Sequence, residues 1–484
     1  MSDRVVRLSD LLGGKGALDT PITGLASDSR KVAPGFLFAA LKGTRSDGRA
    51  FIPQALARGA VALLVPEGSR IDAPVPVIED RRPAQRLAMM AAAFHGAQPA
   101  IMAAVTGTNG KTSTASFSRQ LWTLLGRKAA SIGTLGIERE SGLTPGELTS
   151  PDPIGLHADL GALAAEGTEC AILEASSHGL VQNRLDGVRL DIAAFTNLSH
   201  DHLDYHRTQE AYFHAKARLF SELLPDEGQA VISLAGPHGE RMADIARGRG
   251  TPVITVGRAP GATLSVLEAN ATKDGQSLRV LWKGDSCKIA LPLIGDFQAD
   301  NALLAAAIVM ASGARPAETF AAMSELKPVP GRLEFIGRTT RGGSVYVDFA
   351  HTPEGLRTVL EAMRGHCPGR LHVLFGCGGD RDRSKRPAMG HIAAEAADTV
   401  IVTDDNPRHE DPAAIRRAIL EGAPKAREIA DRGTAIRAAI AMLGEGDCLV
   451  IAGKGHERGQ IIGDEILPFS DRAFAALCLK ENGA

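Results

Sequence analysis

The segment that most constrains the fold is AIMAAVTGTNGKTST, because three local patterns follow one another there without a break. An apolar run over residues 101–105 predicts a buried β-strand, a glycine-rich segment predicts a loop, and the residues after it predict a helix. Strand and helix patterns alternate from this point onward, which is typical of parallel α/β architecture. The chain is therefore expected to bury parallel strands between layers of helices.

The composition fits a globular protein, since 44% of the residues are hydrophobic and 23% are charged. The length of 484 residues predicts about three domains. We place them at residues 1–97, 98–329 and 330–484, with the second boundary in the Pro/Gly-punctuated stretch KPVPGRLE. A net charge of -2 gives no basic excess for nucleic acid, and no signal peptide or long apolar segment is visible. We therefore expect a cytoplasmic protein without a membrane span.

The glycine-rich segment predicts a phosphate-binding loop formed by Gly107, Gly110, Lys111 and Thr112. Backbone N–H groups of such a loop can hold phosphates, the lysine neutralises them, and the threonine hydroxyl can bind Mg²⁺. The longer Walker pattern requires glycine where this chain has Val105, so the segment is a shorter GxxGKT variant. Such a short motif alone can be an ordinary turn, and the strand before it and the helix after it favour the phosphate loop.

Two further strand patterns of the central part end in polar residues: Glu174 follows one, and Asn197, Asp201 and His202 follow the other. A carboxylate and an imidazole near a phosphate loop predict a metal site. No HExxH or CxxC pattern is present, which argues against a dedicated zinc site. Solvated or structural roles are expected for three other histidines: His200, His206 and His214.

Lys216 lies within the helical pattern TQEAYFHAKARLFSELL, on the same face as Tyr212, Phe213, Leu219 and Phe220. Lysine is rare on an apolar stripe. The periodicity alone favours a stem that carries its amine out to water. The alternative is a desolvated amine with a lowered pKa.

Four apolar runs in the last third each end in a polar cluster: SVYVDFAH, RLHVLFGCGGDRD, ADTVIVTDDNPR and DCLVIAGKGHE. In doubly wound sheets, ligands bind beyond the carboxyl ends of the strands. Any one of these ends could be a simple turn, but four of them together predict a binding site. Arg408 raises the question of which carboxylate it binds.

These motifs, taken together and in order, resemble the Mur ligase family, which makes peptidoglycan precursors. They are TGTNGKT, EASSHGLVQNRLDG, TNLSHDHLDYH, AYFHAKARLF, GDFQADNALLA, PGRLE, DFAHTP, GCGGDRD, DDNPR and AGKGHE. The resemblance implies a three-domain α/β fold: a small N-terminal domain, a central P-loop ATPase-like parallel sheet domain and a C-terminal Rossmann-like domain.

The resemblance also implies an ATP-dependent amide ligase that uses Mg²⁺. Its substrates would be UDP-MurNAc-L-Ala-D-Glu, meso-diaminopimelate and ATP, and a monomer is expected. The D-glutamate side-chain carboxylate would take the γ-phosphoryl group of ATP, and the amine of the amino acid would then displace phosphate.

Residue roles are carried over by motif. The implied ATP-binding residues are Gly107, Thr108, Asn109, Gly110, Lys111, Thr112, Ser113, Asn301, Arg332 and Asp348. The implied metal ligands are Thr112, Glu174, His202 and Lys216. The implied catalytic set is Lys111, Glu174, His202, Lys216, Arg332 and Asp348. Lys216 matches the lysine that the family carbamylates with CO₂, a reaction that requires a neutral amine.

The implied contacts to the UDP-MurNAc-dipeptide are Ser29, Thr44, Arg45, Ser46, Thr149, Ser150, Ser176, Gln182 and Arg184. Two positions depart from the family pattern: Leu148 replaces the common asparagine, and His200 replaces the usual arginine. A substrate contact is therefore expected to be lost or replaced at Leu148.

The implied diaminopimelate contacts are Arg381, Asp405, Asn406, Pro407, Arg408, Gly453 and Glu457. Family members with DNPR generally use meso-diaminopimelate, which is lysine with a second carboxylate at its distal end. A guanidinium can bind that carboxylate through two parallel hydrogen bonds, and lysine would leave Arg408 unpaired.

Three alternatives remain at this stage. A folylpolyglutamate synthetase-like ligase shares the mechanism, but DNPR, AGKGHE and the N-terminal SDSRKV argue against it. A P-loop kinase or motor would not need the arginine-lined strand ends of the last domain. A catalytically silent nucleotide-binding module conflicts with the complete set of Lys111, Glu174, His202 and Lys216.

Overall fold

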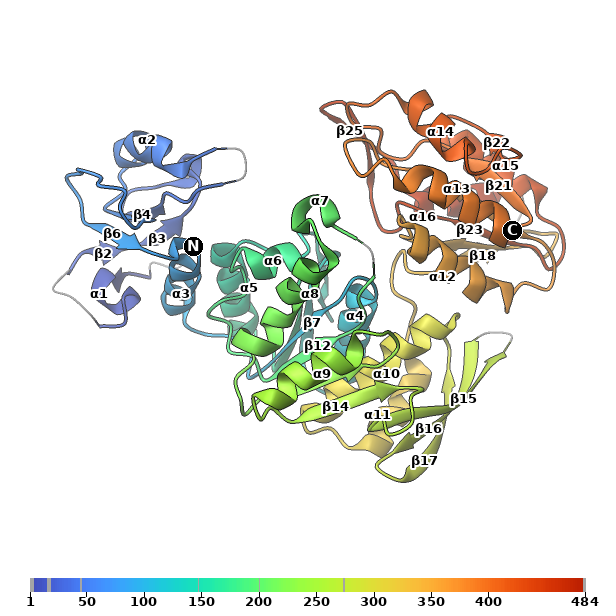
Figure 1. Cartoon of the computed structure of the whole chain (residues 1–484), viewed down its shortest axis with the longest axis horizontal. Helices are drawn as coiled ribbons and strands as arrows, with labels where there is room; N and C mark the ends of the chain where they lie inside the picture. The colour runs from blue at the N-terminus through green and yellow to red at the C-terminus, as the bar shows by residue number, and fades with distance from the viewer. Residues whose placement is uncertain are drawn as a thin grey trace.

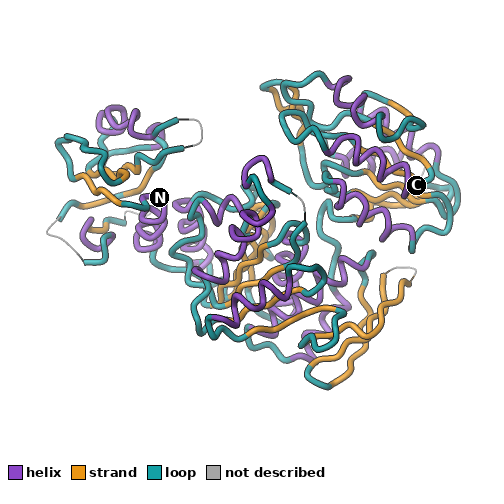
Figure 2. Tube along the Cα trace, viewed as in Figure 1, coloured by secondary structure: helices purple, strands orange, loops and turns teal. Residues whose placement is uncertain are grey.

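The computed structural model describes residues 4–14, 19–43, 46–146, 148–199, 201–272 and 275–481. They form three α/β domains that follow one another as separate lobes, with the N-terminal and C-terminal lobes on either side of the central one (Figure 1). Each lobe has its own sheet with helices packed on it (Figure 2). Within these residues, no helix is both long and apolar enough to cross a membrane.

The N-terminal domain is built on four parallel strands in the order β3-β4-β5-β6. Side chains alternate along β4, so that Leu37 packs with α1 and α3 while Phe38 packs with α2 on the opposite face. The strands are β1 (Val6–Arg7), β2 (Pro21–Ile22), β3 (Gly24–Ala26), β4 (Phe36–Ala39), β5 (Ala62–Pro66) and β6 (Val77–Asp80). The helices are α1 (Leu8–Leu11), η1 (Ser29–Lys31), η2 (Gly48–Phe51), α2 (Ile52–Ala57) and α3 (Pro83–His95).

The central sheet has eleven strands in the order β10-β9-β8-β11-β7-β12-β13-β14-β15-β16-β17. The strands from β8 to β15 in this order are parallel neighbours, and antiparallel strands extend the sheet at both edges. The strands are β7 (Ile101–Thr106), β8 (Ala129–Gly133), β9 (Gly136–Arg139), β10 (Gly142–Thr144), β11 (Cys170–Glu174), β12 (Ile192–Phe195), β13 (Gln229–Ser233), β14 (Val253–Gly257), β15 (Leu264–Thr272), β16 (Gly275–Trp282) and β17 (Asp285–Leu291).

Helices cover both faces of this sheet, because β7 and its neighbours are apolar on both sides. One face packs against α4, α10 and α11, and the other against α5, α6, α8 and α9. The helices are α4 (Lys111–Leu124), α5 (Pro153–Ala165), α6 (Ser177–Val181), α7 (Leu203–His206), α8 (Gln209–Arg218), η3 (Leu219–Leu223), α9 (Gly239–Gly248), α10 (Asp296–Ala311), α11 (Pro316–Ala322) and η4 (Met323–Glu325). The helix predicted through Leu224 changes at Leu219 into the π-helical turn η3.

The C-terminal domain has six strands in the order β18-β19-β23-β20-β21-β22, all parallel except the edge strand β18. The strands are β18 (Glu334–Arg338), β19 (Ser344–Val347), β20 (Leu371–Phe375), β21 (Thr399–Val402), β22 (Arg427–Glu428) and β23 (Cys448–Ile451), with a separate hairpin of β24 (Gly459–Ile462) and β25 (Glu465–Pro468). The helices are α12 (Pro353–Arg364), α13 (Lys385–Ala396), α14 (Pro412–Leu420), α15 (Arg432–Met442) and α16 (Asp471–Glu481).

The four predicted strands of this domain, β19, β20, β21 and β23, are adjacent and parallel. Helices α12, α13 and α14 pack on one face, and α15 and α16 on the other. Because the strands are parallel, their polar carboxyl ends meet at one edge of the sheet. This arrangement confirms the prediction that the four ends lie together.

Candidate active site

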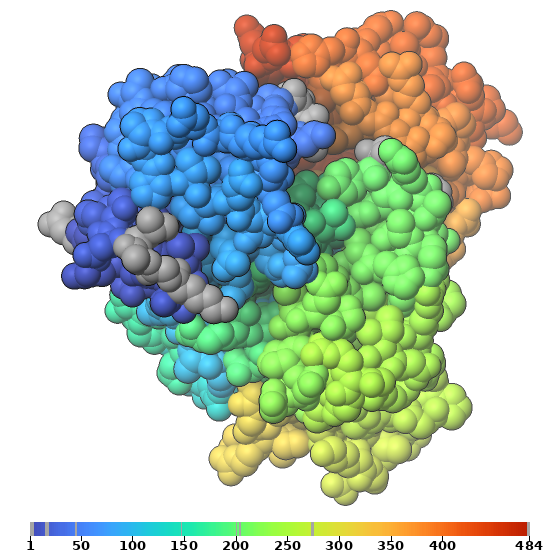
Figure 3. Space-filling model, turned by 60° about the vertical axis from the view of Figure 1, so that its left-hand side comes forward, coloured from blue at the N-terminus to red at the C-terminus, as the bar shows by residue number. Residues whose placement is uncertain are grey.

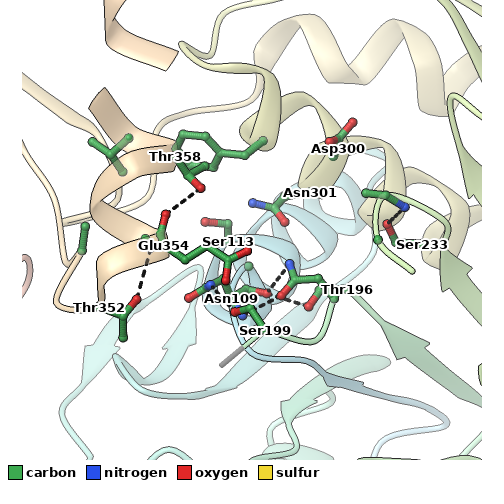
Figure 4. Close-up of a pocket in the computed structure, with 18 of the residues that line it drawn as sticks. Asn109, Ser113, Thr196, Ser199, Ser233, Asp300, Asn301, Thr352, Glu354 and Thr358 are labelled. Atoms are coloured by element: carbon green, nitrogen blue, oxygen red, sulfur yellow. Dashed lines mark hydrogen bonds between the residues drawn. The ribbon is translucent and has the colours of Figure 1, made fainter. Parts of the chain in front are cut away.

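A cavity of about 360 Å³ lies between the phosphate loop of the central domain and the start of α12 in the C-terminal domain (Figure 4). Six of the predicted ATP-binding residues line it: Asn109, Gly110, Ser113, Asn301, Arg332 and Asp348. The space-filling view also shows a hollow where the three domains approach one another (Figure 3). The structure therefore brings most of the predicted ATP set to one interdomain cavity.

The phosphate loop is hydrogen-bonded to Asn197, which lies just after the neighbouring strand β12. The backbone N–H groups of Thr108 and Asn109 donate to the carbonyl and side-chain oxygens of Asn197, at 2.9 and 3.0 Å. Gly110 has a left-handed φ of +85°, and a side chain there would overlap the amide of Asn301. Glycine therefore lets α10 approach the loop closely, and α4 begins at Lys111, two residues earlier than the helix predicted after Thr112.

Lys111 and Thr112 face two different groups. The Lys111 amine donates to the carbonyl oxygens of Gly107 and Thr108, at 2.9 and 2.8 Å, and burial lowers the pKa of Lys111. The Thr112 hydroxyl donates to the carboxylate of Glu174 at 3.0 Å. Glu174 is buried, and the N–H of Thr134 also donates to it at 2.8 Å.

The carboxylate of Glu174 has the type of ligand atom that Mg²⁺ requires. Its carboxylate makes no ion pair within 4 Å among the described residues, and it lies beside a hydroxyl. Mg²⁺ prefers oxygen ligands of this kind, so the residues present fit the ion. In the same described part of the chain, no group of three or more His, Cys, Asp or Glu side chains is placed to hold a metal.

Arg332 and Asp348 reach the loop from the C-terminal domain. The Arg332 guanidinium donates to the Thr112 hydroxyl at 3.2 Å and lies over the ring of Phe349, 4.5 Å from its centroid. The Asp348 carboxylate accepts backbone N–H groups of Leu333 and Ala350, at 2.6 and 2.7 Å. Burial raises the pKa of Asp348 to about 6, although nearby Arg332 opposes the shift.

Lys216 is buried and does not carry its amine to water. It is 1% exposed, its Nζ donates to the Gly107 carbonyl at 2.7 Å, and it lies 4.3 Å from the centroid of the Tyr212 ring. Burial, reinforced by Lys111, lowers the pKa of Lys216 well below its usual value. The interpretation as a snorkelling lysine, which periodicity favoured, is wrong, because periodicity shows the face of a helix but not what covers that face.

His202 belongs to a cluster of rings beside Lys216. Its ring centroid lies 6.1 Å from that of Tyr212 and 5.0 Å from that of His178. Its φ of +53° is unusual for a residue with a side chain, and such strain is often found at functional sites. Partial desolvation lowers the pKa of His202 to about 4, although its side chain is 46% exposed and the Asp201 carboxylate, 3.5 Å away, opposes the shift; the neutral imidazole is the form that binds metals.

The other named histidines differ in exposure. His206 is buried and contacts the Ser177 hydroxyl at 2.9 Å, whereas the exposed His214 contacts Glu210 at 2.9 Å. Both fit the structural or solvated roles expected for them. His200 lies outside the described residues.

Hydroxyl groups of the predicted dipeptide site converge behind Glu174. The hydroxyls of Ser150 and Ser176 are 3.0 Å apart, and that of Thr149 lies 3.0 Å from the hydroxyl of Thr134. Arg184 joins this group because its guanidinium donates to the Ser150 carbonyl at 2.7 Å. It also donates to Gln182 at 2.7 Å.

The residues of the N-terminal domain that were predicted to bind the UDP-MurNAc-dipeptide differ in their exposure to solvent. Ser29 is buried, and its hydroxyl donates to the amide oxygen of Gln54 at 2.7 Å. Ser46 is exposed, and Thr44 and Arg45 lie outside the described residues. Leu148 is 47% exposed, so its side chain is accessible.

The predicted amino-acid residues gather at the strand ends of the C-terminal domain. Asn406 donates to the Glu457 carboxylate at 2.9 Å. A side chain on Gly453 would come within 2.6 Å of the Asp405 carboxylate. Asp405 and Asn406 are both buried, and Pro407 lies next to them in the chain. The structure therefore brings five of the predicted contacts together.

Arg408 is fixed at this edge with a left-handed φ of +51°. Its N–H donates to the Ile461 carbonyl at 3.0 Å, and its Nη1 donates to the Gly379 carbonyl at 2.8 Å. Burial lowers the pKa of Arg408, and the positive charge of Arg381 adds to this effect. Within the described ranges, neither guanidinium has a carboxylate partner within 4 Å. Asp405, Glu457 and Asp380 act on Arg408 from a greater distance, and two neighbouring guanidiniums without a direct carboxylate partner among the described residues suit a bound carboxylate.

Several residues around the cavity were not predicted. They are Thr196, Ser233, Asp300, His351, Thr352 and Glu354. Ser233 ends β13, and Thr352 precedes α12, so the strand-end rule that identified the other residues could have included them. Arg432 and Lys454, by contrast, are buried beside residues that were predicted to bind the amino acid, and no motif marks Arg432.

The phosphate loop faces a second α/β domain across this cavity, and two guanidiniums lie at the strand ends of that second domain, an arrangement that suits an enzyme joining a nucleotide-activated group to an anionic substrate. Three family profiles match the chain: the Mur ligase family catalytic domain over residues 21–95, the Mur ligase middle domain over 105–309, and the Mur ligase glutamate ligase domain over 331–455. The chain belongs to the Mur ligase family.

Curated relatives align over nearly the whole chain. A protein of Caulobacter vibrioides is 51% identical over 473 residues, which cover 96% of this chain and 97% of that protein. A protein of Brucella melitensis is 48% identical over 480 residues, which cover 99% and 98%. Both are named UDP-N-acetylmuramoyl-L-alanyl-D-glutamate--2,6-diaminopimelate ligase.

Solved structures agree with the domain architecture. A structure of a ligase with the same name superposes with a TM-score of 0.73 and 32% identity, covering 99% of this chain and 100% of that one. A folylpolyglutamate synthase of Mycobacterium tuberculosis gives a TM-score of 0.62 at 21% identity over 81% and 92%. The second likeness shows the fold alone.

Proposed function

We propose that this protein is an ATP-dependent ligase that joins meso-diaminopimelate to the D-glutamate side-chain carboxylate of UDP-MurNAc-L-Ala-D-Glu in peptidoglycan precursor synthesis. The names of the relatives support this activity. The observation that carries the choice of amino acid is the pair of guanidiniums, Arg381 and Arg408, without a carboxylate partner among the described residues. Residues 1–97 are assigned to the uridine nucleotide, 98–329 to ATP, and 330–484 to the amino acid.

ATP is assigned to the interdomain cavity. The loop from Gly107 to Ser113 would hold its phosphates through backbone N–H groups, and Asn301 and Asp348 would contact the nucleotide. Thr112, Glu174, His202 and Lys216 would hold Mg²⁺ directly or through its waters. The ion would supply charge neutralisation at the phosphates. Arg332, which donates to Thr112 in this structure, would act on the phosphoryl group in transfer.

Lys216 is assigned as a carbamylated lysine. Its amine and that of Lys111 both donate to the Gly107 carbonyl oxygen, and two ammonium ions on one oxygen repel each other. A neutral Lys216 amine relieves this repulsion. Its nitrogen can then form a bond to the carbon of CO₂ and lose a proton, which leaves a carbamate anion. The carbamate would place negative charge near the metal ligands.

The nucleotide-dipeptide is assigned to Ser29, Thr44, Arg45, Ser46, Thr149, Ser150, Ser176, Gln182 and Arg184. The hydroxyl cluster next to Glu174 supports this assignment, because it lies beside the metal and phosphate groups. An oxygen of the D-glutamate carboxylate would bond to the γ-phosphorus while the bond to ADP breaks. The amine nitrogen would then attack the acyl carbon, lose a proton and release phosphate.

The distal end of diaminopimelate is assigned to the strand ends of the C-terminal domain. Arg408, with Arg381 beside it, would bind the distal carboxylate, and Asp405, Asn406 and Glu457 would receive the ammonium group. Pro407 and Gly453 would shape the backbone around it. Lysine has no distal carboxylate and would leave the guanidinium unpaired, which is a strong basis for discrimination.

The substrates are intracellular metabolites, so we place the reaction in the cytoplasm, and we propose that the enzyme acts as a monomer. The test is phosphate release by the purified protein with ATP, Mg²⁺, UDP-MurNAc-L-Ala-D-Glu and meso-diaminopimelate. Steady turnover should need all four components, and the product mass should be that of the tripeptide. No release in the complete mixture would refute the assignment.

A further inference from the structure

The loop that carries Glu457 also reaches the residue assigned to the phosphate. Nη1 of Arg332 lies 3.4 Å from Nδ1 of His456. A guanidinium can only donate, so Nδ1 is the acceptor in this contact. His456 therefore stands between the amino-acid site and Arg332.

Close backbone packing holds this loop against the linker between the domains. A Cβ on Gly331 would overlap the backbone nitrogen of His456. A Cβ on Gly455 would lie 2.8 Å from Cβ of Phe349 and 2.9 Å from the carbonyl oxygen of Gly331. Both glycines have positive φ, at +66° and +53°. The loop and the linker are therefore fixed relative to each other.

The Phe349 ring supports both side chains. The Arg332 guanidinium lies 4.5 Å from its centroid, and the His456 ring lies 5.1 Å from it at a tilt of 45°. Only His456 offers Arg332 a lone pair from a side chain of the amino-acid loop. Arg332 also donates to the Gly331 carbonyl and to the Thr112 hydroxyl, both at 3.2 Å, so the Nδ1 of His456 is the acceptor among these three that comes from the amino-acid loop, and it shares in setting the rotation of the guanidinium.

His456 is in the right protonation state for this contact. Burial lowers the pKa of His456 to about 3, and the charges of Arg332 and Arg458 add to the effect. The imidazole is neutral at pH 7 and keeps a lone pair for Arg332 when Nε2 carries the proton.

The residues on either side of His456 are fixed at the amino-acid site. The amine of Lys454 is fully buried and donates to Asn406 at 2.8 Å and to the Glu457 carboxylate at 2.9 Å. Asn406 also donates to Glu457 at 2.9 Å. Lys454 and Glu457 flank His456 in the chain and are both held by Asn406, so the segment that carries His456 is anchored on both sides at the amino-acid site.

We propose that His456 is a positioning residue that orients the Arg332 guanidinium on the nucleotide through its Nδ1, so that the loop binding the incoming amino acid also aims the phosphate-stabilising arginine. This inference rests on the proposed function for the role of Arg332. It adds a residue that touches neither the phosphate nor the amino acid and acts through its neighbour.

Two substitutions separate the acceptor from the ring. His456→Asn keeps an acceptor close to the position of Nδ1 and removes the ring, whereas His456→Phe keeps the ring against Phe349 and removes the acceptor. We expect His456→Phe to lower kcat at least tenfold with an unchanged KM for diaminopimelate. We expect His456→Asn to stay within threefold of the wild type. A non-hydrolysable ATP analogue, measured by calorimetry, should bind about tenfold more weakly to His456→Phe alone.

Wild-type turnover in the same assay tests the proposed function, and analogue binding tests His456 independently of turnover. Equal losses in both variants, or a larger loss in His456→Asn, would show that the ring matters rather than the acceptor and would overturn the inference. A kcat within threefold of the wild type in His456→Phe would also overturn it. If His456→Phe does not fold, as judged by its melting temperature, His456→Leu replaces it, since it has nearly the shape of asparagine without an acceptor.

Discussion

Arg408→Ala should weaken the binding of diaminopimelate and leave ATP unaffected. The backbone of Arg408 is held on both sides, because its N–H donates to Ile461 and its carbonyl accepts the N–H of Gly463 at 2.8 Å. One edge of the guanidinium is bound to the Gly379 carbonyl. Truncation at Cβ therefore removes the cation while the loop keeps its hydrogen bonds.

The magnitude follows from the burial of the guanidinium. Truncating one partner of a buried, hydrogen-bonded charge pair costs about 2–5 kcal/mol. Arg408 is only partly buried, so the lower part of this range applies, about 2–3 kcal/mol. At about 1.4 kcal/mol per factor of ten, the KM for diaminopimelate should rise about 30- to 150-fold.

The assay is phosphate release at saturating ATP with diaminopimelate varied, and then with the two reversed. The matched control is Arg417→Ala, which removes an arginine of α14 that is 67% exposed and should leave both KM values within twofold of the wild type. An equal rise in the KM values for ATP and diaminopimelate in Arg408→Ala would refute the assignment of Arg408 to the distal carboxylate. A change of less than threefold in the KM for diaminopimelate would refute it as well.

Three further outcomes are expected. Lys216→Met should reduce kcat at least 100-fold without lowering the melting temperature, because it removes a buried amine. In ¹³C-labelled bicarbonate, the wild-type protein should show a carbamate signal by NMR. Absence of this signal in active enzyme would contradict the carbamylation of Lys216. Arg432→Met should cost about 3–5 kcal/mol in urea unfolding, because it leaves the fully buried Asp471 unpaired, whereas the half-exposed Arg437→Met should cost under about 1 kcal/mol. Folding lowers the pKa of His456 from 6.5 to about 3, so the imidazole binds a proton more weakly in the folded protein than in the unfolded chain. The free energy of unfolding should therefore be highest above pH 6.5 and should fall by about 2 kcal/mol between pH 7 and pH 5. His456→Asn should reduce this dependence on pH.

The strand ends of the C-terminal domain were predictable because their signals are local. Each strand is a short apolar run that stops at Gly, Asp or Asn, and parallel pairing then places all the ends at one edge. The helix after the phosphate loop was predictable for the same reason, although α4 begins at Lys111 rather than after Thr112. By contrast, the antiparallel strands β15, β16 and β17 at the sheet edge were not predicted, since their place depends on long-range pairing.

The contacts within the site that sequence reasoning did not foresee join residues that are distant in the chain. Thr112 and Arg332 are 220 residues apart in the chain, yet their side chains meet. Lys216 donates to the carbonyl oxygen of Gly107, which lies in the distant phosphate loop, and the periodicity of its own helix cannot show this contact. His456 stands in a quoted motif, but its contact with Arg332 requires the packing of two glycines from different segments.

The most direct test of the central claim is a competition between meso-diaminopimelate and L-lysine at equal concentration, with the products resolved by mass. We expect at least a 100-fold preference for the diaminopimelate product, and we expect Arg408→Ala to reduce this preference at least tenfold. Comparable amounts of the two products from the wild-type enzyme would contradict the claim that Arg408 selects the substrate through its distal carboxylate.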